Sequence, residues 1–402
     1  MPVTLTAVKK NPCAFQIELF CRGLRIDDSC TLETDARGLG RTRAGLGSGL
    51  ELVIPASPRD VWLNAPVEEA FASASPFTLR LREHYEVVDG RDGEVYPVRL
   101  PEEPAWYRWR TSSGLEMRRV GVLQGTYLAV YVGRSCAFWQ SDGALTCRFC
   151  TTGLNVRDAV SVDDVVETAR TAKKESGVTF VHLNTGYQRG RALQWMAPHV
   201  EAIKRRVGAL VGVQAVPEGT HADYDRLLEL GCDHFSFCPE FHDPDWFREL
   251  CPGKDAVVGQ RAFYEALSFC QRRLPKGACS GELIAGCEPF DATLAAINKI
   301  TDLGAFPTVC IFRPLQGSRM EDWPSPRPEQ MQAVMKHVWE RCRDRGIPIG
   351  LAPNVEVSLI VQPTDGAYLA DGNWRDRWYR LKLAVMRALA APTFRRRMSI
   401  RR

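Results

Sequence analysis

Long apolar runs are missing from this sequence of 402 residues. No unbroken apolar stretch reaches about 18 residues, the length that a membrane-spanning helix needs. The opening MPVTLTAVKKNP also lacks the apolar segment of a secretory signal. We therefore expect a cytoplasmic protein without membrane contact. In a reducing compartment most of its 14 cysteines are expected to be free thiols that pack as small apolar side chains.

A strong charge of one sign is missing as well. The formal net charge is +4, and the basic residues are spread along the chain except in the tail Arg395, Arg396, Arg397, Arg401 and Arg402. Such a run is most often a solvated chain end. The composition therefore predicts no dedicated nucleic-acid surface.

A phosphate-binding loop is missing from the Gly-rich stretch Gly38 to Leu50, GLGRTRAGLGSGL. It lacks the third glycine of GxGxxG, and no Lys follows Gly45 as a P-loop requires. We interpret this stretch as a flexible loop.

Two short pairs of metal ligands, the usual mark of a structural zinc site, are also missing. Between Arg134 and Gly153 the chain has Cys136, Cys147 and Cys150, which gives C-x10-C-x2-C with only one short pair. The next histidine is His182, inside a predicted strand. Three thiolates with an open fourth position suit a [4Fe–4S] cluster that has one bare iron. The apolar segment Tyr127 to Val132 before the loop predicts a strand.

From Leu128 onward, predicted strands and helices alternate. Six such units argue for right-handed crossovers and a parallel sheet, either a three-quarter barrel or an open doubly wound sheet. The predicted strands after the first are 178–183, 211–216, 233–238, 278–285 and 308–312. One predicted helix begins at Ser161, and the others are 192–207, 220–231, 260–273, 292–303 and 329–345.

The cysteine loop after the first predicted strand resembles the signature of the radical S-adenosylmethionine superfamily. The usual spacing there is C-x3-C-x2-C, so the first gap is longer here, while Phe149 matches the aromatic before the last cysteine. The resemblance decides for an α/β fold with a partial (β/α)6 TIM-like barrel over residues 126–346. It implies that Cys136, Cys147 and Cys150 hold a [4Fe–4S] cluster whose fourth iron binds S-adenosylmethionine.

Further strand ends are similar to the cofactor-binding segments of this superfamily. Asn184, Thr185 and Gly186 match the tripeptide at the methionine amino group, and Glu240 matches the acid that holds the ribose hydroxyls. The segment Gly281 to Glu288 resembles GxIxGxxE, so Gly281, Leu283 and Ala285 are expected to let adenine lie against the strand backbone and Glu288 to complete the motif. Phe312 to Ser318 resembles the segment after the sixth strand in biotin synthase-like members.

The resemblance implies an enzyme in which the reduced cluster cleaves S-adenosylmethionine, giving a 5′-deoxyadenosyl radical that abstracts hydrogen from a small organic substrate. A flavodoxin- or ferredoxin-type reductant is then the expected partner. The alternative is a barrel that uses an iron–sulfur or zinc loop only as a binding scaffold. Biotin synthase uses barrel cysteines and an arginine for a second cluster. Arg313 invites this comparison here. For the barrel cysteines Cys238, Cys279, Cys287 and Cys310, however, the favoured role is to fill the core as small apolar side chains.

Two further regions flank the predicted barrel. Residues 1–125 are expected to be a mostly β accessory region, with strands at 77–82 and 94–100 joined through the turn 90–93. Trp106, Tyr107 and Trp109 are expected to pack against the barrel rather than to stack on a ligand. Residues 347–402 are expected to close the open edge of the barrel and to include a helix at 375–389.

Overall fold

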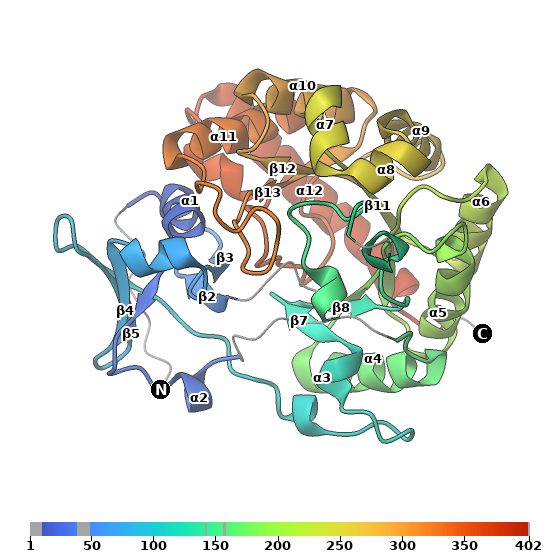
Figure 1. Ribbon diagram of the computed structural model, residues 1–402, viewed down its shortest axis with the longest axis horizontal. Coiled ribbons are helices and arrows are strands. Elements are labelled where there is room, and N and C mark those ends of the chain that lie inside the picture. Colours follow the sequence, from blue (N-terminus) through green and yellow to red (C-terminus); the bar gives the residue numbers. More distant parts are fainter. Residues whose placement is uncertain (1–9, 38–48, 141–142, 156–157, 401–402) are drawn as a thin grey trace.

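The computed structural model describes residues 10–37, 49–140, 143–155 and 158–400 (Figure 1). The loop expected from Gly38 to Leu50 lies outside these ranges except for its last two residues, and so do Arg401 and Arg402. Among the described helices, none combines the length and the apolar character that crossing a bilayer requires.

A seven-stranded sheet in the order β13-β12-β11-β10-β9-β8-β7 forms the centre of the molecule. Strands β8 to β13 are parallel, and each pairs with the next strand in the chain, so the prediction of six parallel strands is confirmed. The sheet has one strand more than predicted, β7, which pairs antiparallel with β8. The bounds are β7 (Val122–Gln124), β8 (Tyr127–Tyr131), β9 (Phe180–Asn184), β10 (Leu210–Gln214), β11 (His234–Glu240), β12 (Cys279–Ala285) and β13 (Phe306–Ile311).

Helices cover the outer face of the curved sheet, which makes the fold a partial barrel (Figure 1). The helix ends follow from local capping. The Ser161 side chain accepts from the backbone N–H of Asp164, Thr220 and Asp223 form a capping box, and Gly231 ends its helix in the left-handed conformation. The helices are α4 (Val162–Ser176), α5 (Ala192–Arg206), α6 (His221–Leu230), α7 (Pro244–Leu250), α8 (Pro252–Val257), α9 (Gln260–Gln271), α10 (Phe290–Asp302) and α11 (Pro328–Asp344).

The segment after α11 runs beside both edges of the open barrel. The backbone N–H of Thr126, next to β8, donates to Glu356 O at 3.1 Å, and Val361 forms an isolated bridge with Val309 of β13. The chain then continues into the long helix α12 (Trp374–Arg397), which extends past the end predicted for it. The boundaries proposed at 125 and 346 stay predictions.

The N-terminal region combines a four-stranded sheet in the order β1-β4-β5-β6 with a separate hairpin, β2 and β3. The prediction that the turn 90–93 joins strands 77–82 and 94–100 is wrong, because β5 lies between them in sequence and in the sheet. The charged residues around Tyr85 obscured its period-two pattern. The bounds are β1 (Arg25–Ile26), β2 (Leu50–Ile54), β3 (Val61–Ala65), β4 (Phe77–Leu81), β5 (Tyr85–Asp89) and β6 (Val95–Pro97).

Three helices of this region were not predicted: α1 (Pro12–Arg22), α2 (Leu32–Asp35) and α3 (Met117–Val120). The first, α1, is buried along most of its length, and Asn11 caps it by accepting from two backbone N–H groups. Trp106 is buried, and its indole N–H donates to Ser176 Oγ of α4 at 2.9 Å. Packing is therefore the use of this aromatic, as expected.

Candidate active site

The cysteine loop leaves the C-terminal end of β8 and turns back against the end of β9. The backbone N–H of Ala137 donates to Tyr187 O at 2.9 Å, and Cys150 N–H donates to Cys147 O at 3.0 Å, which closes the turn between the paired cysteines. This is the edge of a parallel sheet where the strand-to-helix loops converge. The loop therefore lies where the sequence predicted it.

Cys136 packs directly on Gly186, and this close approach requires glycine there. A Cβ atom at Gly186 would lie 2.6 Å from Cys136 Cβ and 2.9 Å from both Cys136 Sγ and Tyr131 Oη. The backbone N–H of Gly186 donates to Tyr131 Oη at 2.8 Å. Gly186 is the last residue of the tripeptide expected at the methionine amino group, and its missing side chain leaves room for Cys136.

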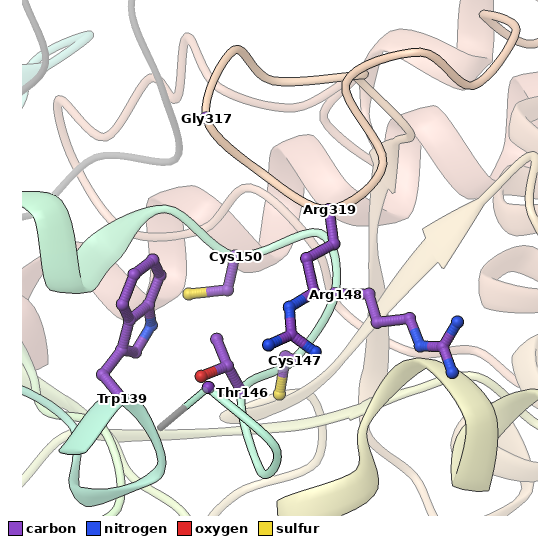
Figure 2. A pocket seen from close by; sticks show the side chains of 8 residues that line it. Trp139, Thr146, Cys147, Arg148, Cys150, Gly317 and Arg319 are labelled. Carbon is purple, nitrogen blue, oxygen red and sulfur yellow. The ribbon is translucent and has the colours of Figure 1, made fainter. Parts of the chain in front are cut away.

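Cys147 and Cys150 line a surface pocket of about 390 Å³ together with Trp139, Thr146, Arg148 and Arg319 (Figure 2). The two sulfur atoms point in different directions in Figure 2. A hydrogen bond from the Cys251 thiol lowers the pKa of Cys147, whereas burial raises the pKa of Cys150 and raises that of Cys136 to about 12.

The three thiols supply the donor chemistry of an iron–sulfur cluster, and beside the larger effect of burial Cys147 lies near enough to raise the pKa of both Cys136 and Cys150. Across the described part of the chain, however, no three Cys, His, Asp or Glu side chains already converge as a metal site. Cys147 instead hydrogen-bonds to Cys251, a buried thiol at the junction of α7 and α8. The donor set therefore fits a cluster, while the side-chain directions are those of free thiols.

Glu240 ends β11 and forms a buried ion pair that the sequence did not reveal. Its Oε1 accepts from Lys254 Nζ at 2.6 Å, and the same ammonium donates to Cys238 O at 3.0 Å. Glu240 has φ +63°, a left-handed backbone that lifts its side chain out of the strand direction. Burial raises the pKa of Glu240, and Lys254 opposes that rise.

Glu288 has its carboxylate occupied by the loop after β11. It accepts from the backbone N–H groups of His242 at 2.7 Å and Asp243 at 2.9 Å, and from Thr293 Oγ1 at 3.3 Å. Burial raises the pKa of Glu288, although these donors oppose the rise. Its role in this structure is to hold the β11–α7 loop.

The small residues of β12 face the helices and not the barrel interior. A Cβ at Gly281 would lie 2.7 Å from Ile300 Cδ1 of α10, and Leu283 and Ala285 share that face because side chains alternate along a strand. The side chains of Gly281, Leu283 and Ala285 therefore point toward α10. The expectation that adenine lies against the backbone of β12 stays a prediction.

The alternate face of β12 places Glu282 in the lumen, which the sequence analysis missed. Gln214 Nε2 donates to Glu282 Oε2 at 2.5 Å, Ser236 Oγ donates to the other carboxylate oxygen, and Asn184 Nδ2 donates to Gln214 Oε1 at 2.5 Å. The Cys238 thiol lies 3.4 Å from Glu282 Oε2. The sequence does contain a signal for this, because the polar residues Ser280 and Glu282 occupy alternate positions of β12 and therefore share one face of the strand.

This polar cluster lines a lumen cavity of about 460 Å³. The wall is otherwise largely apolar and aromatic, with Tyr127, Phe180, Phe306 and Phe394 among the lining residues. Two histidines also line it. Burial lowers the pKa of His182 to about 3 and that of His234 to about 4, so both are neutral at pH 7.

The remaining predicted residues have packing or bridging contacts. Phe149 is buried edge-on against Phe241, with ring centroids 5.9 Å apart. Thr185 Oγ1 sits where a Cβ on Gly133 would be. Arg313 donates to the Asn64 side chain of β3 at 3.1 Å, so it ties the barrel to the N-terminal region. Cys310 lines the lumen cavity, whereas Cys279 is fully buried on the helix side of β12.

The segment after β13 reaches back to the cysteine loop. Arg319 N–H donates to Arg148 O at 2.9 Å, and Gly317 and Arg319 line the same pocket as Cys147 and Cys150 (Figure 2). The first and last strands of the parallel set thus both contribute to this edge.

No family model matches the chain. Bacteriochlorophyllide c C-7(1)-hydroxylase of Chlorobaculum limnaeum is 23% identical over 146 residues, which is 36% of each chain. The match thus spans about a third of that relative's length.

Among solved structures, the chain is similar to methylornithine synthase at 15% identity, with TM-score 0.42 over 52% of this chain and 60% of the other. A radical SAM methyltransferase from Sphaerobacter thermophilus gives 14% identity and TM-score 0.40 over 68% and 76%. Coproporphyrinogen III oxidase of Escherichia coli, described as a radical SAM enzyme, gives 14% and 0.33 over 42% and 41%. Because these likenesses are distant, the fold is defined here by its own strand order and pairing.

Proposed function

We propose that this chain is a radical S-adenosylmethionine enzyme, with a cluster held by Cys136, Cys147 and Cys150. The observation that carries the proposal is the position of three thiols on one loop at the C-terminal edge of a six-stranded parallel barrel, with Glu240 at the same edge. When bound there, the cluster and S-adenosylmethionine would supply a 5′-deoxyadenosyl radical able to abstract hydrogen.

The chain's own residues would orient the ligands and exclude water. Gly186 leaves space beside Cys136, and Tyr131 fixes the backbone there. Asn184, Thr185 and Gly186 at the end of β9, Phe149 in the loop and Glu240 at the end of β11 would bind S-adenosylmethionine beside the cluster. Gly281, Leu283 and Ala285 would contribute backbone, and Glu288 would keep the neighbouring loop in place.

The substrate proposed is a small organic molecule bound in the lumen. The cavity of about 460 Å³ has apolar walls and a hydrogen-bonding centre at Glu282, Gln214 and Asn184, while both of its histidines are neutral. Such a lining favours a largely apolar, uncharged substrate with one hydrogen-bonding group, because burying an unpaired charge is costly.

Reduction of the cluster would come from a flavodoxin- or ferredoxin-type protein. All fourteen cysteines are free thiols, which suits a reducing cytoplasm. The biotin synthase-like branch stays a prediction, and the engagement of Arg313 by Asn64 gives it no support.

Anaerobic reconstitution with iron and sulfide tests the proposal. We expect about four irons per chain and formation of 5′-deoxyadenosine from S-adenosylmethionine on addition of dithionite. A Cys136→Ser/Cys147→Ser/Cys150→Ser variant is the control. Binding of zinc in place of iron, with S-adenosylmethionine left intact, would instead support the scaffold alternative.

A further inference from the structure

Helix α12 has an inner face that packs on the barrel and an outer face that nothing described covers. Asp376, Tyr379 and Leu383 are buried on the inner face. Asp376 accepts from Arg343 at 2.6 Å and from the Trp339 indole at 3.0 Å, and the Tyr379 hydroxyl donates to Ile347 O. The helix is therefore firmly placed, and its outer face has a fixed direction.

The outer face presents a continuous apolar stripe. Its members recur at intervals of three or four residues, so they fall along one side of the helix. Trp374 is 76% exposed, Trp378 63% and Leu389 75%. Large apolar side chains this exposed are informative when they are contiguous. The stripe consists of Trp374, Trp378, Leu381, Val385 and Leu389.

Cations border this stripe on both sides. Arg377 and Arg395 fall on one flank and Lys382 on the other, with Arg396 at its C-terminal end, and all four are exposed. The helix contains one acid, Asp376, which is buried on the inner face. The outer face of α12 is thus apolar in the middle and positive at its margins.

We propose that α12 docks the protein on a bilayer of anionic lipids, with the stripe at the level of the headgroups and the cations on lipid phosphates. Tryptophans beside arginines and lysines are the side chains that favour this interface, and positive charge complements anionic lipid. A second copy is a poorer occupant, because twofold pairing of this face would set cations of both copies against each other.

The inner side of the same helix closes the lumen cavity. Ala390, Thr393, Phe394 and Arg397 line it from α12. Docking through the outer face would therefore bring a cavity with apolar walls next to the membrane. This placement suits ligands that partition into lipid, although the docking surface itself does not depend on the proposed radical chemistry.

Vesicle co-sedimentation of the full chain tests the proposal. We expect binding to phosphatidylcholine vesicles containing phosphatidylglycerol, weaker binding to phosphatidylcholine alone, and a decrease as salt rises. Trp378→Ser combined with Leu389→Ser should lower the partition coefficient by about tenfold or more, because two apolar side chains lose their burial in lipid. Arg377→Gln with Arg395→Gln should lower binding only to the anionic vesicles.

Trp109→Ser is the matched control, since Trp109 is 47% exposed and belongs to the N-terminal region and not to α12. It should leave binding unchanged. Circular dichroism shows whether each variant is folded. Absence of binding to anionic vesicles, or equal loss of binding in Trp109→Ser, would overturn the proposal. So would a dimer in sedimentation velocity that dissociates in Trp378→Ser/Leu389→Ser, since a second copy would then cover the stripe.

Discussion

Lys254 of α8 places its ammonium 2.6 Å from the Glu240 carboxylate at the end of β11, and both side chains are nearly buried. The charge of Lys254 also lowers the pKa of the neighbouring Cys147. One short helix thus connects the acid expected to bind ribose with a thiol expected to bind iron.

Removing this cation should destabilise the fold. Lys254→Met leaves the Glu240 carboxylate buried without its partner, so we expect the free energy of unfolding to fall by about 3 to 5 kcal/mol. Denaturant titration measures it. The double variant Lys254→Met/Glu240→Gln should recover much of the loss, because no charge then stays buried alone. A double variant as unstable as the single one would show that packing of the lysine chain, not its charge, matters.

Serine substitutions measure the contribution of each thiol to iron binding. Cys136→Ser, Cys147→Ser and Cys150→Ser should each lower the iron bound after anaerobic reconstitution, because each removes one thiolate ligand. Cys251→Ser should keep the iron, since its thiol is only the hydrogen-bond partner of Cys147. Iron analysis and electron paramagnetic resonance provide the measurement. If Cys251→Ser lost iron and Cys136→Ser kept it, the assigned ligand set would be wrong.

Gly186→Ala should displace Cys136. The new methyl group would lie 2.6 Å from Cys136 Cβ, which is closer than such atoms approach in proteins, so the loop must move. We expect reduced iron binding and a loss of stability of about 1 to 3 kcal/mol. Gly90→Ala is the control, because a Cβ there would meet only Pro76 O, at 3.2 Å. Equal iron content in Gly186→Ala and the unmodified protein would contradict the close packing.

Acid should destabilise the barrel through its lumen histidines. Burial lowers the pKa of His182 to about 3, below about 6.5 for an unfolded chain, so the unfolded state binds more protons between these values. The contribution of neutral His182 to the free energy of unfolding is thus fully present above pH 6.5 and is lost as pH falls toward 3. The unmodified protein should therefore lose unfolding free energy relative to His182→Leu as pH falls through that window, by up to about 1.4 kcal/mol per pH unit.

Urea titrations at several pH values measure this difference. His84→Leu, at the turn after β4 and outside the barrel, controls for the loss of a histidine as such. A difference that stays constant from pH 6.5 to pH 4 would mean that His182 is solvated in the folded state.

The order of elements was predictable from the sequence because it is a local property. Strands and helices are defined by apolar periodicity and by local end signals, and neither needs contacts with distant residues. The end signals here are the N-caps Ser161 and Thr220 and the terminating Gly231. Six alternating units then leave few topologies. The hairpin strand β7 and the strand β5 were missed because each is short or charged and gains its place by pairing with a neighbour.

The sequence by itself determined the six parallel strand–helix units and the one loop that carries three thiols, because strand alternation and cysteine spacing are written in consecutive residues. Only the tertiary structure decided what those residues contact. It turned Gly281, Leu283 and Ala285 toward α10, put Glu282 in the lumen, paired Glu240 with Lys254, and left the stripe of α12 outside. The physical reason is that strand orientation and helix docking depend on how distant apolar faces are buried together, which no local pattern specifies.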